Sequence, residues 1–255
     1  MLMAVQEPYA LMVQQDDILI NPRELDEPLG TMVCFHSRYA LGDHHDFADK
    51  DAFLQKLYLN MVGNTPEGEA SYEKLVDSFS NERAADNALL DVISEKYIVQ
   101  PLYLLDHSGL AMQTTGFHDP WDSGQVGWIY VSKEAVQKAL EISELTEDDL
   151  QKARVMLDSE VAVYDSYLRG ECYGYELYKN GELEDSCWGF LGPVEEAVQA
   201  MADHLPDECR GMVEHLEEQD HPATIIKTLL RHAKIQVEQA AKVISHESRQ
   251  LMPDR

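Results

Sequence analysis

The strongest constraint on the fold is a turn signal in the C-terminal half of the chain. Residues 172–190, CYGYELYKNGELEDSCWGF, place Asn180-Gly181 between two stretches rich in aromatic residues. Both central residues of a type I′ turn need a positive φ, which Asn and Gly adopt readily. The pattern therefore predicts a β-hairpin, whose two strands run antiparallel.

Further strand patterns lie upstream of the hairpin. Residues 101–131 contain stretches rich in β-branched and aromatic residues, and the first two are separated by the short turn DHSG at 106–109. Short connections join antiparallel strands, so this region is predicted to form a meander. We expect the meander, the hairpin at 171–190 and a strand at 31–38 to form one antiparallel sheet.

Helical periodicity fills much of the remaining chain. Apolar residues recur at steps of three and four over 50–95 and 133–168, which predicts helices that cover the sheet. The strand-helix-strand rhythm of a parallel sheet is absent from the sequence. The predicted fold class is therefore α+β, an antiparallel sheet covered by helices, with a long C-terminal helix.

The C-terminal region is predicted to be a helical extension. A helix of about 25 residues is expected from near Ala223, because apolar residues recur there with helical spacing. Three of them are expected to dock it: Ile226, Leu230 and Val237. We place a core domain at 1–195 and a helical extension at 196–255, and we expect the extension to serve oligomerisation or partner binding.

The composition predicts a soluble globular protein. The chain has 255 residues, 44% of them hydrophobic, which is enough to bury a sizeable core. No apolar run approaches the roughly 18 to 20 residues of a membrane span, and the N-terminal residues lack the basic start of an export signal. The four cysteines show no C-x-x-C spacing, so we expect neither a zinc ribbon nor a disulfide framework, and a reducing cytoplasm is the expected compartment.

Charge is the most unusual bulk property of the chain. The sequence holds 47 acidic and 20 basic residues, a net charge of −27, which disfavours direct binding to nucleic acid. Residues 144–220 contain 21 acidic and 5 basic residues, whereas 221–255 contain 3 and 6. One interpretation is a highly soluble surface, and the other is a surface that binds a basic partner. For the second, the candidate contact residues are Glu147, Asp148, Asp149, Glu182, Glu184, Asp185, Glu195, Glu196, Glu217 and Glu218.

Motifs of the well-known enzyme classes are absent from the sequence. The chain has no Walker loop, G-x-G-x-x-G, H-E-x-x-H or G-x-S-x-G, and no cofactor is expected. Residues 106–122 nevertheless gather four candidate side chains near turns of the meander: His107, His118, Asp119 and Asp122. Three interpretations stay open, namely turn chemistry with packing, a partner-binding rim, or general acid-base or metal chemistry.

A second cluster of histidines and carboxylates lies in GDHHDFADKD, residues 42–51. Imidazole and carboxylate groups suit zinc or manganese, so His44, His45 and Asp46 are candidate metal ligands. Adjacent histidines point in different directions in any regular element, which argues against a shared ion. The preferred interpretation is a polar loop in which Asp46 or Asp49 caps the helix that follows.

Four blocks of the sequence together resemble a recurrent, functionally uncharacterised family of proteins in phages and integrated mobile elements. In chain order they are NPRELDEPLGTMVCFHSRYALGDHHDF, PLYLLDHSGLAMQTTGFHDPWDSGQVGWIYVSKE, DSEVAVYDSYLRGECYGYELY and DSCWGFLG. The resemblance covers about residues 20–195. It supplies no catalytic residues and implies a phage or mobile-element accessory protein in a bacterial cytoplasm.

Resemblance and charge together favour a binding protein over an enzyme. We expect it to inhibit a basic host protein such as a nucleic-acid-binding defence nuclease, in the manner of an anti-CRISPR or anti-restriction protein that mimics nucleic acid. One alternative is a metal-assisted hydrolase with its site in 106–122, and another is a replication-associated or regulatory module. No membrane partner is expected, and the C-terminal helix is a candidate for homo-oligomer formation.

Overall fold

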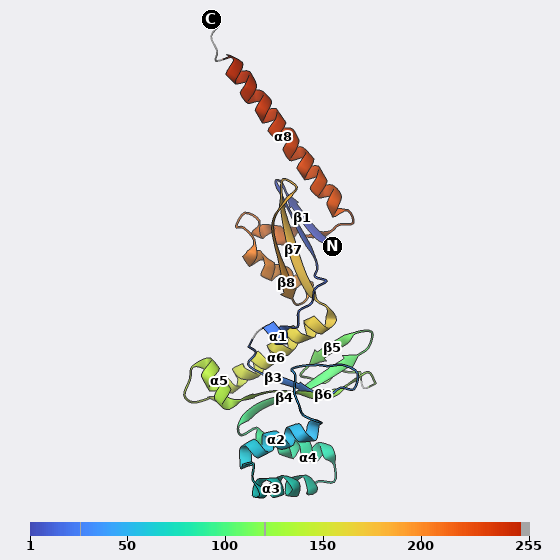
Figure 1. Ribbon diagram of the computed structural model, residues 1–255, viewed down its shortest axis with the longest axis vertical. Helices are drawn as coiled ribbons and strands as arrows, with labels where there is room; N and C mark the ends of the chain where they lie inside the picture. Colours follow the sequence, from blue (N-terminus) through green and yellow to red (C-terminus); the bar gives the residue numbers. More distant parts are fainter. Residues whose placement is uncertain (26, 120, 251–255) are drawn as a thin grey trace. The chain divides into compact units, whose positions relative to one another are not determined.

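The computed structural model describes residues 1–25, 27–119 and 121–250, and for 241–250 it describes the backbone only (Figure 1). The chain divides into two compact units, which we call the central unit, residues 21–169, and the terminal unit, residues 1–20 with 170–255. This division differs from the expected boundary after residue 195, because the segment that follows that residue packs on the sheet of the terminal unit.

The central unit is built on a four-stranded antiparallel sheet in the order β3-β6-β4-β5. The strands are β3 (Thr31–Cys34), β4 (Tyr97–Asp106), β5 (Leu110–Gln113) and β6 (Ser123–Ser132). The helices are α1 (Pro22–Leu25), α2 (Lys50–Val62), α3 (Pro66–Asp77), α4 (Glu82–Ile93), α5 (Lys133–Leu140) and α6 (Glu147–Arg169). The α+β class and the antiparallel pairing of these predicted strands with the strand near residue 31 are thus confirmed. The predicted meander is wrong, because β6 pairs with β4 and not with β5, its neighbour in the chain.

Helices cover both faces of this sheet, because side chains alternate along β6. Ile129 points to the face where Leu157 and Tyr164 of α6 are buried. Its neighbour Trp128 points to the opposite face, where it stacks on Phe53 of α2 with ring centroids 5.5 Å apart. Figure 1 shows α6 on one side of the strands and the α2–α4 group on the other.

The terminal unit contains a second sheet, of five antiparallel strands in the order β8-β7-β2-β1-β9. Its elements are β1 (Leu2–Gln6), β2 (Tyr9–Gln15), β7 (Cys172–Lys179), β8 (Glu182–Leu191), α7 (Val194–Met201), η1 (Ala202–His204), η2 (Arg210–His215), β9 (Glu217–Glu218) and α8 (Pro222–Gln250). The hairpin about Asn180-Gly181 is confirmed as β7 and β8. The expectation that it joins the sheet of residues 101–131 is wrong, because β7 pairs with β2 from the N-terminal segment.

The hairpin of β1 and β2 was not expected from the sequence. Residues 10–13, Ala-Leu-Met-Val, are all buried, since α7 with the short 3₁₀ helices covers one face of the sheet and α8 covers part of the other. A strand buried on both faces loses the apolar-polar alternation by which strands are recognised. Its pattern is therefore that of a short apolar run.

Helix α8 docks on the terminal sheet through its first turns only. Leu229 is buried against Met3, Ala10 and Met12, with Ile225 and Ile226 beside it. Gly181 lets the hairpin turn approach this helix closely, since a Cβ there would lie 2.6 Å from the backbone nitrogen of Leu230. Docking through Ile226 is confirmed, but docking through Val237 is wrong: the helix extends beyond the sheet (Figure 1), and Val237 is 69% exposed. Neither α8 nor any other helix in the described residues is long and apolar enough to cross a membrane.

Two truncations separate the docked part of α8 from the rest. Deleting 222–255 uncovers Met3, Ala10 and Met12, and the loss of buried Leu229 alone is expected to lower the free energy of unfolding by about 1.5–3 kcal/mol. Deleting 231–255 keeps Leu229 in place and is expected to change stability by less than about 1 kcal/mol. Urea unfolding followed by circular dichroism measures both changes. Equal destabilisation by the two deletions would contradict this account of the docking.

Candidate functional site

The ten candidate contact carboxylates fall into two groups. Seven lie in the terminal unit, on β8, α7 and β9: Glu182, Glu184, Asp185, Glu195, Glu196, Glu217 and Glu218. The other three, Glu147, Asp148 and Asp149, form the first turn of α6 in the central unit. There Lys152 binds Asp148 at 2.8 Å and Asp149 at 3.3 Å, and Arg154 lies 3.5 Å from Glu147. The negative charge of the α6 group is therefore largely balanced locally.

The terminal unit has almost no such balancing charge outside α8. We define the acidic body as residues 1–20 and 170–221, which contain 17 acidic residues and 2 basic ones. Both cations are already near carboxylates, Lys179 at 3.9 Å from Glu184 and Arg210 at 3.2 Å from Asp207. Within the described residues, five of the seven candidate carboxylates in this unit are exposed and have no side-chain partner: Glu182, Glu195, Glu196, Glu217 and Glu218. The body is therefore a concentrated and largely unpaired negative surface.

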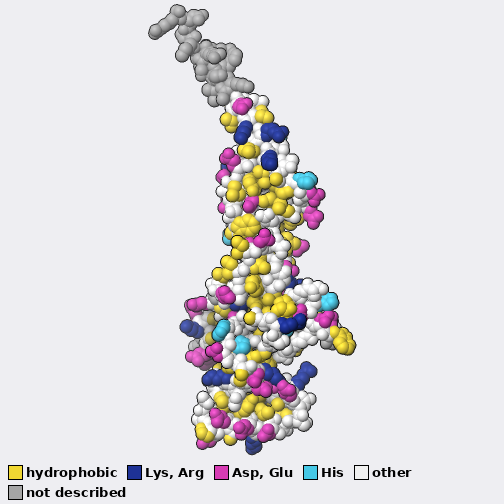
Figure 2. Space-filling view, turned by 45° about the vertical axis from the view of Figure 1, so that its right-hand side comes forward, with side chains coloured by type: hydrophobic (Ala, Val, Ile, Leu, Met, Phe, Trp, Pro, Cys, Tyr) yellow, Lys and Arg dark blue, Asp and Glu magenta, His cyan; other side chains and the backbone are white. Residues whose placement is uncertain are grey.

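Two tyrosines of the acidic body have raised pKa values. Burial raises the pKa of Tyr173, and the carboxylates of Glu171 and Glu195 raise it further. Burial and the hydrogen bond from its hydroxyl to Glu176 raise the pKa of Tyr178 to about 12. Figure 2 shows that Lys and Arg of the terminal unit gather on α8, whereas carboxylates lie along the body. Burial is the larger cause for both tyrosines, and the neighbouring carboxylates add to it.

The cluster at 106–122 forms part of a rim of the central sheet. His107 Nδ1 lies 2.6 Å from Asp122 Oδ2, and Asp119 accepts hydrogen bonds from the backbone nitrogens of Trp121 and Asp122. These hydrogen bonds hold the pKa of Asp119 below its ordinary value. His118 is exposed and has no hydrogen bond or ion pair within the described residues. The structure therefore brings His107, Asp119 and Asp122 together and leaves His118 aside.

This rim offers limited chemistry. The His107–Asp122 pair can transfer a proton, but the Ser123 hydroxyl donates to the backbone oxygen of Asp119 and so supports the loop. Among the described residues, no group of three or more His, Cys, Asp and Glu is arranged to hold a metal ion. The loop also presents the side chain of Trp121, which is 92% exposed.

The histidines at 44 and 45 serve different roles. His45 Nε2 lies 2.9 Å from the backbone oxygen of Cys34, and its ring centroid lies 5.0 Å from that of Phe35. His44 and Asp46 are exposed. Asp49 caps α2 by accepting a hydrogen bond from the Ala52 nitrogen at 2.9 Å, as one of the two predicted caps. Packing and capping thus account for this segment.

The central unit also holds a buried charge network that sequence reasoning missed. The Arg23 guanidinium, 4% exposed, binds both Asp43 oxygens at 2.7 and 2.8 Å, Glu160 at 2.8 Å and the Gly30 backbone oxygen at 2.6 Å. Burial lowers the pKa of Arg23, but the two carboxylates outweigh that effect and raise it above its ordinary value. No sequence signal links Arg23 to Glu160, because 137 positions separate them.

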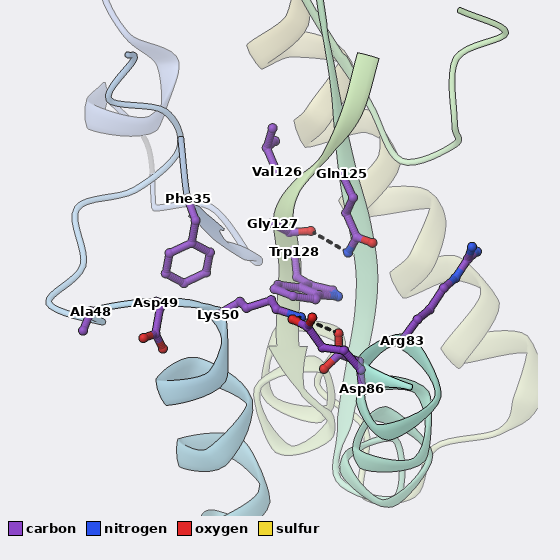
Figure 3. Close-up of a pocket in the computed structure, with 11 residues that line it drawn as sticks. Phe35, Ala48, Asp49, Lys50, Arg83, Asp86, Gln125, Val126, Gly127 and Trp128 are labelled. Atoms are coloured by element: carbon purple, nitrogen blue, oxygen red, sulfur yellow. Dashed lines mark hydrogen bonds and ion pairs between the residues drawn. The ribbon is translucent and has the colours of Figure 1, made fainter. Parts of the chain in front are cut away.

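A pocket of the central unit was also missed. It is a cavity of about 570 Å³ between β6 and the beginnings of α2 and α4, with Phe35 and Trp128 in its wall (Figure 3). Lys50 Nζ lies 2.8 Å from Asp86 and also pairs with Glu82. Burial lowers the pKa of Lys50, but hydrogen bonds to these two carboxylates raise it above its ordinary value. The volume is in the range of ligand-binding pockets.

A bulge in β6 shapes this pocket. Leu102 of β4 pairs with Gly127 and the next residue, Tyr103, pairs with Gln125, so Val126 is an extra residue in β6. Its backbone oxygen accepts a hydrogen bond from the Phe35 nitrogen at 2.7 Å. A second hollow of about 350 Å³ also has Phe35, Gln125 and Val126 in its wall and continues to Trp121 and Asp122. The bulge therefore forms part of the wall of both hollows.

Comparisons with known proteins gave no match. No protein-family model, curated protein or solved structure matches the chain. The resemblance to phage and mobile-element proteins therefore stays a prediction, and function is inferred from the residues themselves.

Replacing Arg23 tests the buried network. Arg23→Met leaves Asp43 and Glu160 as poorly hydrated carboxylates without a cation, so the free energy of unfolding is expected to fall by about 3–5 kcal/mol. Arg83→Met at the pocket removes an exposed guanidinium and is expected to cost less than about 0.5 kcal/mol. Urea unfolding measures both values. A loss for Arg23→Met no larger than that of the control would contradict a structural role for the network.

Proposed function

We propose that this protein is an acidic binding protein of phage or mobile-element origin, whose acidic body occupies the basic nucleic-acid-binding surface of a host protein. The observation that carries the proposal is the charge of that body, 17 acidic residues against 2 basic ones, with exposed carboxylates that have no cation beside them. The target class is a nucleic-acid-handling protein such as a defence nuclease, and the compartment is the bacterial cytoplasm.

The physical basis is competition between two polyanions for one groove. Proteins that bind DNA neutralise phosphates with Lys and Arg, and a duplex presents about one negative charge per 1.7 Å of its axis. A dense set of carboxylates is attracted to the same groove, and steering can raise association rates by about 10–10³-fold. Salt screens this attraction, so binding that depends on it weakens as ionic strength rises.

The terminal sheet holds these carboxylates on a stable framework. Glu182 lies on β8, Glu195 and Glu196 lie in the first turn of α7, and α7 packs on the sheet through Ala197 and Met201. Because α7 and β8 are fixed by packing and strand pairing, their charges need little ordering when a partner binds. The three carboxylates on α6 are weaker candidates, since Lys152 and Arg154 already neutralise them.

The pocket of the central unit is a weaker candidate for contact with the same partner. It has the aromatic side chains of Phe35 and Trp128 in its wall, together with the carboxylates of Asp49, Glu82 and Asp86. Lys50 already pairs with Glu82 and Asp86, and the Arg83 side chain also lines the pocket.

The hydrolase alternative has one observation in its favour, the His107–Asp122 pair. Metal analysis of the purified protein distinguishes the two functions. A stoichiometric metal ion lost on replacing His107 would favour the hydrolase. The regulatory alternative has no comparable group of residues within the part of the chain that the structure describes.

Charge reversal on the acidic body tests the proposed function. The triple variant Glu182→Lys, Glu195→Lys and Glu196→Lys changes the charge by six units without touching a buried side chain. In pull-downs from a bacterial host lysate, the wild type is expected to capture a basic nucleic-acid-binding protein at low salt and to release it at high salt. The triple variant is expected to lose at least about 90% of the captured protein, because each reversal replaces attraction with repulsion.

A matched control carries the same change of charge elsewhere. Glu69→Lys, Glu73→Lys and Asp77→Lys lie exposed on α3 of the central unit and should leave most of the capture intact. Circular dichroism checks that both variants fold. Equal capture by the wild type and both variants, unaffected by salt, would refute the electrostatic mechanism.

A further inference from the structure

Two cavities of the central unit have part of their walls in common. The pocket of about 570 Å³ beside Trp128 lies between β6 and the beginnings of α2 and α4, and a second cavity of about 360 Å³ lies between α4 and β4. Four residues line both of them, and we call these the shared wall: Arg83, Asp86, Gln125 and Trp128. A ligand in either cavity therefore meets the same four side chains.

The apolar part of the walls is aromatic. Phe53 stacks on the Trp128 indole from within the core, with ring centroids 5.5 Å apart, and the same indole lines both cavities. The Phe35 ring stands in the wall of the larger cavity (Figure 3), and Pro101 and Tyr103 stand in that of the smaller one. Aromatic walls of this kind favour a flat ring that can stack on them.

The polar part of the shared wall holds groups that are free to bind. Arg83 is exposed, and within the described residues its guanidinium has no hydrogen bond or ion pair. Asp86 accepts from Lys50 through Oδ2 at 2.8 Å, which leaves Oδ1 free. Gln125 donates through Nε2 to the Gly127 backbone oxygen at 3.3 Å, which leaves Oε1 free. The shared wall thus offers donors from one side chain and acceptors from two others.

The charges in the larger cavity favour an uncharged ligand. Its wall has two cations, Lys50 and Arg83, and three carboxylates, Asp49, Glu82 and Asp86. Lys50 pairs with two of these carboxylates. A phosphate or carboxylate group would meet more negative than positive charge there, and a cationic group would meet Lys50 and Arg83.

We propose that these cavities form a site for an uncharged, flat nitrogen heterocycle with hydrogen-bond acceptors and donors on its edge, the class to which guanine belongs. Guanine presents its O6 and N7 acceptors to an Arg in the commonest base-specific contact of proteins. Its N1–H and N2–H groups are donors for the free oxygens of Asp86 and Gln125, while the ring lies against Trp128. None of these residues belongs to the acidic body, so the site is independent of the proposed function.

Calorimetric titration of the full chain with guanosine tests the site. The wild type is expected to bind guanosine with a dissociation constant below about 1 mM. Arg83→Met is expected to weaken binding at least about tenfold, because the acceptors of the base lose a charged donor. Gln125→Leu removes an acceptor and is expected to weaken binding about threefold or more. The control is Lys56→Met, which removes an exposed cation of α2 outside both cavities and should leave the affinity unchanged. Circular dichroism checks that all three variants fold.

Two further measurements separate this site from unspecific stacking. The double variant Trp121→Phe and Trp188→Phe keeps Trp128 as the sole tryptophan of the chain, and guanosine is expected to quench its fluorescence. Adenosine carries a donor amine in place of O6 and is expected to bind at least about tenfold more weakly than guanosine. No binding of guanosine at 1 mM, equal binding of the two nucleosides, unchanged Trp128 fluorescence or full affinity in Arg83→Met would each overturn the proposal. Partner capture by the acidic body is measured separately, so either proposal can fail alone.

Discussion

The buried Arg23 guanidinium is the charge on which the central unit depends. Its four hydrogen bonds join the segment after Asn21, the loop at Asp43 and helix α6 at Glu160. The same two carboxylates accept backbone hydrogen bonds from Leu29 and from Met32 at the start of β3, each at 2.8 Å. These hydrogen bonds hold the start of β3 and helix α6 in place relative to each other.

That network also shows how the chain uses its few cations. In the central unit, Arg23, Lys50 and Lys152 each contact two carboxylates. That unit has 12 basic residues for 27 acidic ones, a higher proportion of cations than the acidic body has. The acidic body has two cations for 17 acidic residues, and its sheet is held by apolar packing on both faces instead. The negative charge of the acidic body is therefore available to a partner. Its carboxylates also repel one another, which destabilises the folded unit.

Local patterns in the sequence predicted local structure well. The Asn180-Gly181 hairpin, the strands of 97–132 and at Thr31, and the helix from Pro222 are all present, because turn chemistry and periodicity act over a few residues. The meander was wrong, because β6 crosses over to pair with β4. The strand β2 was missed because it is buried on both faces, and the separation into two sheets was missed because β2 pairs with β7 from the other end of the chain. Pairing between strands so far apart in the sequence leaves no pattern in the local sequence of either strand.

The candidate site was predictable to the same extent. His107 and Asp122 were found because neighbouring turns bring them together, whereas the links from Arg23 to Glu160 and from Lys50 to Asp86 span separate elements. The pocket beside Trp128 depends on the bulge at Val126, which a strand pattern does not reveal. The acidity of the chain could be read from its composition. Which carboxylates have no cation beside them could be seen only in the folded structure.

The central claim is that the acidic body takes the place of nucleic acid on a basic partner. Its most direct test is a competition titration, in which the partner holds a fluorescent duplex and the protein is added at several salt concentrations. The account predicts that the duplex is displaced, and that affinity falls steeply between about 50 and 200 mM salt, as it does for DNA itself. Simultaneous binding of duplex and protein, with an affinity that does not change with salt, would contradict it.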